Sequence, residues 1–476
     1  MNPGRYDVIV IGGGFAGLSA AADLASRGIG VLVLEARPSL GGRATAFKDP
    51  ETGELVDNGQ HVLLGCYHET FTFLRRIGAA ANVHIPASLE VTFIDRAGRR
   101  TLLRCPPLPP PWHLFGGLME WEAIGWKDRV AAFKLGRAIR IARRQALGRT
   151  RAIAASPGET VANWLIRNSQ TERLREMLWE PLALAALNQS PRHAAAPFFA
   201  RVLGEMFGSE PRDAAIALPT RPLHLTYAEP AREYIESNGG AVRVNAPARV
   251  RVEDRGVPRV YVREERIDAG AVIVAVPWFA LSSVIEGRPP QLTAILDAAD
   301  RTASSPIVTV NVWLDRPVVD VPFLGLPGRT MQWLFDKRFA FGESASHLSL
   351  VSSGASEVVS KSNEELITLA TTDIFDALPL AREARVLRAT VIREKRATFS
   401  LALNQPARPG SATRIRGLFL AGDWIDTGLP GTIESAVVSG HAAARLAADR
   451  ESRIASPASE VAVASRIPDR GIAPTR

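Results

Sequence analysis

The chain has 476 residues, 46% of them hydrophobic and 22% charged, which suits a folded protein of about two or three lobes and argues against a disordered or fibrous one. Its two cysteines, Cys66 and Cys105, form no CxxC pair and no Cys/His cluster, so we expect neither a disulfide framework nor a metal site, and we expect a reducing compartment. No run approaches the roughly 20 apolar residues that a membrane-spanning helix needs, so any membrane contact should be peripheral.

The formal net charge of +8 comes largely from arginine. It fits an anionic lipid surface, nucleic acid, or arginines spread over a solvated surface. Because the chain has no zinc knuckle, aromatic RNA-binding motif or compact basic helix of the usual kinds, we do not expect a nucleic-acid partner. The N-terminal apolar run breaks at glycines too early for a signal peptide, which predicts a cytoplasmic protein.

The first predicted unit is a β-α-β crossover. Residues 6–11 are apolar and β-branched, residues 12–17 form a glycine turn, and residues 18–27 have the pattern of an alanine-rich helix ending at Gly28. Residues 31–35 form the next strand. A unit of about 30 residues has the size of a nucleotide-binding crossover.

The rest of the chain divides by pattern into further segments. Helical patterns dominate residues 71–215, with a proline-rich interruption at 105–112 and a basic helix near 129–144, and strands return after that. We predict an α/β fold in which a discontinuous Rossmann-type domain carries an α+β substrate domain and a helical insertion. The predicted boundaries are 1–70, 216–285 and 401–449 for the Rossmann-type domain, 71–215 for the helical lobe facing substrate or membrane, 286–400 for the substrate domain and 450–476 for a disordered tail.

A dinucleotide fingerprint lies in the first crossover. Gly12, Gly14 and Gly17 have the GxGxxG spacing, in which the glycines permit the tight turn, the approach of pyrophosphate and close packing of helix on strand. The helix that follows begins near Phe15 and Ala16, so its N-terminal N–H groups point at the phosphates. Glu35, followed by Ala36, ends the second strand, where an acidic residue binds the adenosine ribose.

Three later motifs favour FAD over NAD as the nucleotide. Each is a backbone-rich turn or a helix start of the kind that holds a flavin, and the helix start suits the negative charge that develops on the reduced ring. We therefore predict an FAD-binding domain. The residues of these motifs are Gly41, Gly42 and Arg43 in the second turn, Gly59, Gln60 and His61 in the third, and Gly422, Asp423, Gly431, Thr432 and Ile433 near the C-terminus.

Three motifs recur in this order: the fingerprint with Glu35, the GGR at 41–43, and the AGDW at 421–424 with the helix that follows. Together they resemble the amine oxidase and phytoene desaturase superfamily of FAD enzymes over residues 6–448. The resemblance implies that Ala248 lies against the adenine. The strings DNGQHVLLGCYHETFTFLRRIG at 57–78, PPLPPPWHLFGGLM at 106–119 and AGDWIDTGLPGTIESAVVSG at 421–440 are similar to the hydroxysqualene dehydroxylase branch. That branch implies reduction of hydroxysqualene to squalene by flavin hydride, on a bacterial route towards hopanoids.

This chemistry needs a proton donor for the departing hydroxyl. Four residues in or beside the flavin motifs are candidates: His61, Tyr67, His68 and Asp426. His61 is the first choice because imidazole titrates near neutral pH. His61 could equally serve only as a structural hydrogen-bonding group in its turn. Asp426 could equally be a residue at a helix entry or beside the ribityl chain.

Other readings stay open at this point. A carotenoid-type desaturase would have nearly the same fold and flavin site and run the flavin in the opposite direction, and an amine oxidase should have a polar route and an aromatic cage. A flavin-binding module without activity is disfavoured, since an intact flavin site serves redox chemistry. The sequence has no second dinucleotide fingerprint, so a nicotinamide and a partner reductase both remain as electron donors.

We also expect a hydrophobic isoprenoid substrate and peripheral contact with the inner face of the cytoplasmic membrane. The apolar stretch containing Trp112, Phe115 and Met119 would enter the bilayer interface. Arginines at near-helical spacing would meet anionic head groups. The alternative is an ordinary loop beside a solvated helix. These arginines are Arg137, Arg140, Arg143 and Arg144.

Overall fold

The N-terminal crossover forms where the sequence predicts it. β1 (Arg5–Ile11) and β2 (Val31–Leu34) pair in parallel, and α1 (Phe15–Ala25) connects them. The strand residues are apolar on both faces because the sheet is covered on both sides. The computed structural model describes residues 5–49, 51, 53–208, 210–252, 258–342 and 346–455.

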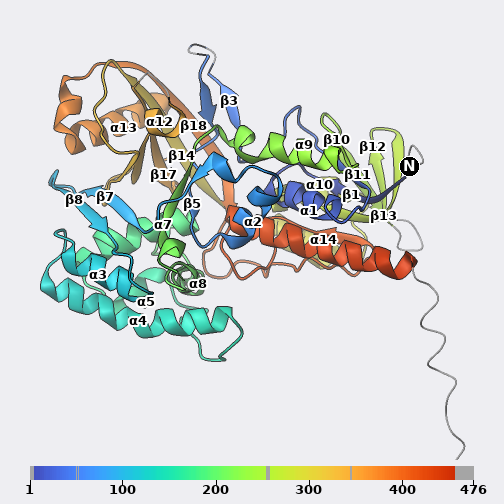
Figure 1. Cartoon of the computed structure of the whole chain (residues 1–476), viewed down its shortest axis with the longest axis horizontal. Helices are drawn as coiled ribbons and strands as arrows, with labels where there is room; N and C mark the ends of the chain where they lie inside the picture. Colours follow the sequence, from blue (N-terminus) through green and yellow to red (C-terminus); the bar gives the residue numbers. More distant parts are fainter. Residues whose placement is uncertain are drawn as a thin grey trace, which may run out of the picture.

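The crossover belongs to a seven-stranded sheet with the order β10-β2-β1-β13-β12-β11, in which β19 also pairs with β13. The start of β13 pairs antiparallel with β12, and its end pairs in parallel with β1 and β19. Helices α1, α9 and α14 pack together along this sheet (Figure 1). The bounds are β10 (Ala241–Arg243), β11 (Ala248–Val252), β12 (Pro258–Val262), β13 (Glu265–Val274), β19 (Leu418–Leu420), α9 (Glu229–Ser237), α10 (Trp278–Val284), α11 (Thr293–Arg301) and α14 (Ile433–Ala455).

A second seven-stranded sheet forms the other half of the molecule, with the order β18-β14-β17-β16-β15-β7-β8. Alternate residues of β14 divide between its faces: Val308, Val310 and Val312 pack in a core with α13, while Ile307 faces a cavity. The bounds are β7 (Glu90–Ile94), β8 (Arg100–Arg104), β14 (Ser304–Leu314), β15 (Phe323–Gly325), β16 (Trp333–Asp336), β17 (Ser346–Ser353), β18 (Val386–Phe399), α12 (Lys337–Phe341) and α13 (Asn363–Ala377).

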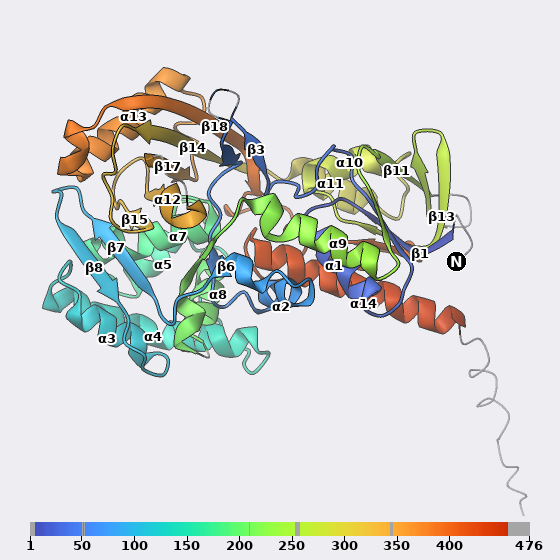
Figure 2. The same cartoon turned by 45° about the horizontal axis from the view of Figure 1, so that its top comes forward.

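A helical lobe covers the side of this sheet opposite α13 (Figure 2). The basic helix predicted near residues 129–144 is present as α4 and packs on α8. Of the described residues, none forms a helix long and apolar enough to cross a bilayer. The bounds are α3 (Trp112–Glu120), α4 (Trp126–Ala146), α5 (Val161–Arg167), α6 (Glu172–Leu174), α7 (Glu180–Leu187) and α8 (Ala196–Met206), with a π-helical turn at Arg175–Trp179.

Short elements join the two halves. β3 (Ala46–Lys48) pairs with β4 (Leu55–Asp57) as a two-stranded sheet. β9 lies between β5 and β6, and α2 follows β5. The bounds are β5 (Leu63–Leu64), β6 (Val83–His84), β9 (Ile216–Pro219), α2 (His68–Arg76), a second π-helical turn at His224–Ala228 and short 3-10 turns at Ala80–Asn82, Pro211–Ala214 and Pro379–Glu383.

The α/β fold class is confirmed, and the structure corrects two predicted segments. The helical assignment of 71–215 is wrong for β7 and β8, which form a hairpin at the edge of the second seven-stranded sheet. The predicted tail of 450–476 starts too early, because α14 continues to Ala455. Residues 456–476 lie outside the described part of the chain.

Candidate functional site

The fingerprint glycines are required by close contacts of the backbone. Gly12 has φ +114°, and a Cβ there would lie 2.5 Å from the Ala275 carbonyl oxygen. A Cβ on Gly17 would collide with the Gly12 carbonyl oxygen, so this glycine permits the helix to pack on the strand. Gly14, at the start of α1, faces Gly42, where an added Cβ would lie 3.4 Å from the Gly14 Cα. The first two glycine turns therefore meet backbone to backbone.

Glu35 is buried at the end of β2 and ties this turn to its own strand. Its Oε2 accepts the Gly13 N–H at 2.7 Å, and its Oε1 accepts the Arg37 N–H at 2.9 Å. Both carboxylate oxygens keep further lone pairs. The side chain is thus held in place beside the cavity.

The second turn is anchored by an aromatic pair that the sequence analysis missed. The Gly41 N–H donates to the Gly13 carbonyl at 2.8 Å, and the Tyr227 hydroxyl donates to the Gly41 carbonyl at 2.8 Å. The Tyr227 ring stacks on Phe15 with centroids 3.5 Å apart. Burial raises the pKa of the Tyr227 phenol, so it remains a donor.

Arg43 connects the second turn to the C-terminal motif. Its Nη2 lies 2.5 Å from the Asp423 Oδ1, and its Nη1 donates to the Ala397 carbonyl at 2.6 Å. The guanidinium also lies over the Trp278 ring, 5.6 Å from its centroid. Arg43 and Asp423, which the sequence places in two separate flavin motifs, are therefore each other's partners here.

The third turn places His61 at the cavity with a defined tautomer. The His61 Nδ1 lies 2.8 Å from the Gly59 carbonyl oxygen. Because a carbonyl only accepts, Nδ1 carries the hydrogen and Nε2 is the nitrogen that can gain or lose a proton. Burial lowers the pKa of His61 below its ordinary value of 6.5, opposed by the Gly59 hydrogen bond and the Asp57 charge and assisted by Arg43 and Lys337. The imidazole is therefore neutral at neutral pH.

Tyr67 is the other predicted proton donor at the cavity. Burial raises the pKa of its phenol, the nearby Cys66 and Glu434 add to the shift, and a side-chain hydrogen bond with Thr432 opposes it. Glu434 itself lies behind Tyr67 and accepts the Glu69 and Thr70 N–H groups at 3.0 and 2.9 Å. The phenol therefore stays protonated over the working pH range.

One cavity of about 820 Å³ unites these turns, within the usual range for ligand sites. All the residues predicted to bind the cofactor line it, except Gly17, which packs α1 on β1. The cavity continues from the glycine turns into a chamber between the second seven-stranded sheet and the helical lobe. The chamber walls are Leu89, Val91, Phe93, Leu103, Leu178, Leu182, Met206, Phe207, Ile216, Ile307, Phe323, Trp333, Phe335 and Val351.

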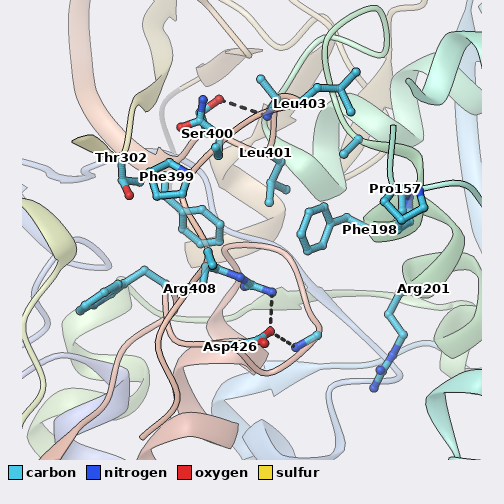
Figure 3. Close-up of a pocket in the computed structure, with 18 of the residues that line it drawn as sticks. Pro157, Phe198, Arg201, Thr302, Phe399, Ser400, Leu401, Leu403, Arg408 and Asp426 are labelled. Carbon is cyan, nitrogen blue, oxygen red and sulfur yellow. Dashed lines mark hydrogen bonds and ion pairs between the residues drawn. The ribbon is translucent and has the colours of Figure 1, made fainter. Parts of the chain in front are cut away.

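The other two predicted proton donors, His68 and Asp426, do not line this cavity. The His68 side chain is 65% exposed at the start of α2, and its Nε2 lies 3.4 Å from Asp213. Asp426 lines a second cavity of about 530 Å³, where its carboxylate pairs with Arg408 at 3.2 Å (Figure 3). A turn of the chain after Trp424 carries Asp426 away from the flavin motif, which the linear sequence does not show.

The cavity fits a flavin dinucleotide. Glycines remove side chains where the first two turns meet, a buried carboxylate closes one end, and the N-terminus of α14 opens onto the cavity at Thr432 and Ile433. Such a helix start favours negative charge. Beyond the glycine turns, the same cavity has a mostly apolar lining.

Similarity to known proteins also indicates a flavin cofactor. Residues 15–448 match the family model described as flavin containing amine oxidoreductase. The chain belongs to this family. As an enzyme of the family it is an FAD-dependent oxidoreductase, as the sequence predicts.

Two groups of curated relatives match along almost the whole chain. A hydroxysqualene dehydroxylase of Sinorhizobium fredii is 30% identical, covering 93% of this chain and 98% of the relative. One of Zymomonas mobilis is 29% identical over 92% of this chain and 98% of its own. A 15-cis-phytoene desaturase of Glycine max is 24% identical, covering 91% and 78%. The predicted resemblance to the hydroxysqualene dehydroxylase branch is confirmed.

Solved structures share the fold. An oxidoreductase from Methanosarcina mazei superposes with a TM-score of 0.70 at 18% identity, covering 92% of this chain and 99% of that one. Putrescine oxidase gives the same TM-score and identity over 94% and 99%. At this identity the likeness concerns the architecture alone.

Proposed function

We propose that this enzyme reduces hydroxysqualene to squalene, replacing an allylic hydroxyl by hydride, and that it serves a hopanoid pathway. The observation that carries the proposal is the single cavity that joins the nucleotide turns to an apolar chamber. The hydroxysqualene dehydroxylase relatives, about equally similar along their whole length, support the substrate.

In this proposal the three glycine turns, Glu35, Ala248 and the start of α14 hold FAD. The bound cofactor supplies hydride chemistry, and the protein supplies orientation and exclusion of water. The chamber walls of Leu, Val, Phe and Trp residues desolvate an isoprenoid chain and place its polar end towards the flavin turns. His61 and Tyr67 are the polar side chains at that end that we assign to the hydroxyl.

We assign the proton to His61. When protonated, Nε2–H donates a proton to the departing hydroxyl, the C–O bond breaks, and water leaves. Tyr67, which keeps its proton, is a hydrogen-bond donor that orients the hydroxyl. The lowered pKa makes the imidazolium a stronger acid than an ordinary histidine, at the cost of a small protonated fraction at neutral pH.

The experiment uses the purified protein reduced with dithionite under anaerobic conditions. Hydroxysqualene is added, the flavin absorbance is followed, and the extracted lipid is analysed by mass spectrometry. We expect squalene to appear together with reoxidised flavin. Unchanged reduced flavin and unchanged lipid, in folded and FAD-loaded protein, would contradict the proposal.

A polyene desaturase is the second candidate, because phytoene desaturases are 24–25% identical over 91% of this chain. The same protein in its oxidised state, given a polyene precursor that still has saturated bonds to oxidise, tests this candidate. Desaturated product with flavin reduction would favour this direction over the dehydroxylase. In the dehydroxylase direction the flavin needs an electron donor, for which we propose a nicotinamide or a partner reductase.

We further propose that the enzyme works at the inner face of the cytoplasmic membrane and binds through α3 and α4. Trp112 on α3 is 60% exposed and Trp126 on α4 is 69% exposed, although tryptophan is normally buried. Phe115 and Phe133 stack between the helices at 4.1 Å, so the two helices present one surface. Exposed basic residues of α4 adjoin it, namely Lys127, Lys134, Arg137, Arg140 and Arg144.

A further inference from the structure

Lys337 is a buried lysine to which the chemistry above gives no task. It is the first residue of α12, directly after β16, and its side chain is 1% exposed. Lysine is almost never fully buried unless it is paired, because an ammonium loses its hydration there. The groups that contact the ammonium therefore indicate the role of Lys337.

The Lys337 ammonium reaches two side chains of the third flavin turn. Its Nζ lies 3.2 Å from the Asp57 Oδ2 and 2.5 Å from the Gln60 Oε1, and 4.5 Å from the centroid of the Phe341 ring. The other oxygen of Asp57 accepts the Leu223 N–H at 3.2 Å. The Lys337 ammonium therefore contacts Asp57 and Gln60, the first and last residues of segment 57–60.

The segment that Lys337 contacts leads directly into the cavity wall. Gln60 lines the cavity, and its Nε2 donates to the carbonyl of His61 at 3.2 Å. On the other side, Trp333 and Phe335 of β16 line the apolar chamber just before Lys337. One buried ammonium therefore links a strand of the chamber to the turn that carries Gln60 and His61.

We propose that Lys337 is a positioning residue that fixes the Gln60–His61 turn against the flavin, so that cofactor and substrate chamber keep one relative geometry. The inference rests on the proposed place of FAD in this cavity. Lys337 acts through Gln60, which lines the cavity. The ion pair with Asp57 alone would only connect the end of β4 to the start of α12. A purely structural ion pair and a positioning residue respond differently when both charges are removed.

The test compares apoproteins of four variants with the wild type: Lys337→Met, Lys337→Met with Asp57→Asn, Gln60→Ala, and Lys361→Met as control. Lys361 is a half-exposed lysine that pairs with Glu365 on the surface. Each is titrated with FAD by fluorescence, the visible spectrum of bound flavin is recorded, and urea unfolding is measured.

We expect Lys337→Met to raise the FAD dissociation constant about tenfold or more, as loss of a hydrogen bond to a charged group does. The double variant should recover stability towards the wild type, because it leaves no unpaired buried charge, while its FAD affinity and spectrum stay altered. Gln60→Ala should reproduce the altered affinity and spectrum. Lys361→Met should match the wild type.

Wild-type FAD affinity and spectrum in the double variant and in Gln60→Ala would overturn the role of Lys337. These two variants decide the matter even if Lys337→Met alone fails to fold. Gly14→Val tests the cavity separately: Gly14 has φ −91°, so its backbone accepts a side chain, which would stand where the first two turns meet. Unchanged FAD affinity in Gly14→Val would overturn the cofactor placement itself.

Discussion

His61 and Tyr67 line the same cavity, yet burial changes their protonation in opposite directions. Loss of hydration disfavours the charged form of each, so the pKa of the imidazole falls and that of the phenol rises. At neutral pH both groups are uncharged, and the phenol alone carries its dissociable proton. Of these two groups, only His61 changes its protonation state at mildly acidic pH, so a pH profile distinguishes them.

The first prediction concerns this profile. If His61 supplies the proton, the rate of squalene formation by pre-reduced protein should rise as the pH falls through the folded-state pKa of His61, which lies below 6.5. The sign follows because the active form is the protonated one. Single-turnover rates measured from about pH 5 to about pH 8 test this expectation.

His61→Asn is the matched variant, since an amide can still donate to the Gly59 carbonyl but does not titrate. It should lower the acidic rate by about a hundredfold, the usual size of general acid catalysis, and flatten the profile. A retained acidic rise would assign the proton elsewhere. A flat wild-type profile with a large loss in Tyr67→Phe would assign it to the phenol.

Residues of the site could be found from the sequence where the backbone itself demands a residue type. Gly12 and Gly59 have positive φ and lie in short turns after strands, so the local sequence alone predicts glycine turns at these positions. Tyr227 and Lys337 were not found, because their partners Gly41 and Gln60 lie 186 and 277 positions away. A single tyrosine or lysine has no local signal of such a contact.

Among the elements, those with a strong local period were predicted and those defined by distant partners were not. The basic helix predicted near 129–144 is present as α4, and α4 begins at Trp126 with Asp128 in its first turn. The β7–β8 hairpin was missed because it is short and lies amid helices. It becomes a sheet edge only through the pairing of β7 with β15, far along the chain.

The second prediction belongs to α3 and α4. Trp112→Ser with Trp126→Ser should lower binding to vesicles containing anionic lipid by about tenfold or more, since burial of each large apolar side chain contributes about 1.5–3 kcal/mol. Vesicle flotation measures the bound fraction. Added salt should weaken wild-type binding further, because basic residues of α4 adjoin the patch.

The control for this surface uses other elements, namely the 3-10 turn at Pro379–Glu383 and strand β18. Leu380 and Leu387 are also exposed apolar residues, so Leu380→Ser with Leu387→Ser removes similar hydrophobic area. It should leave vesicle binding unchanged. Equal losses in both double variants, or none in either, would count against α3 and α4 as the membrane face.

At the scale of the whole molecule, the FAD-binding domain is assembled from segments far apart in the chain. β19 joins the sheet beside β13, and α14 packs on α1. The pair of Arg43 and Asp423 bridges 380 positions. Because Arg43 and Asp423 both line the cavity, their ion pair connects the N-terminal and C-terminal segments of this domain at the cavity itself.

The third prediction follows from this ion pair. Arg43→Met or Asp423→Asn alone should each lower the free energy of unfolding by about 2–3 kcal/mol, because the first leaves the buried Asp423 carboxylate without its donor and the second leaves the Arg43 guanidinium without its countercharge. Each should also weaken FAD binding. The double variant should lose less stability than the sum of the two, because no charge is left unpaired. Urea unfolding of the apoproteins with FAD titrations gives the four corners of the cycle, and strictly additive losses would show that the bridge does not couple the ends of the chain.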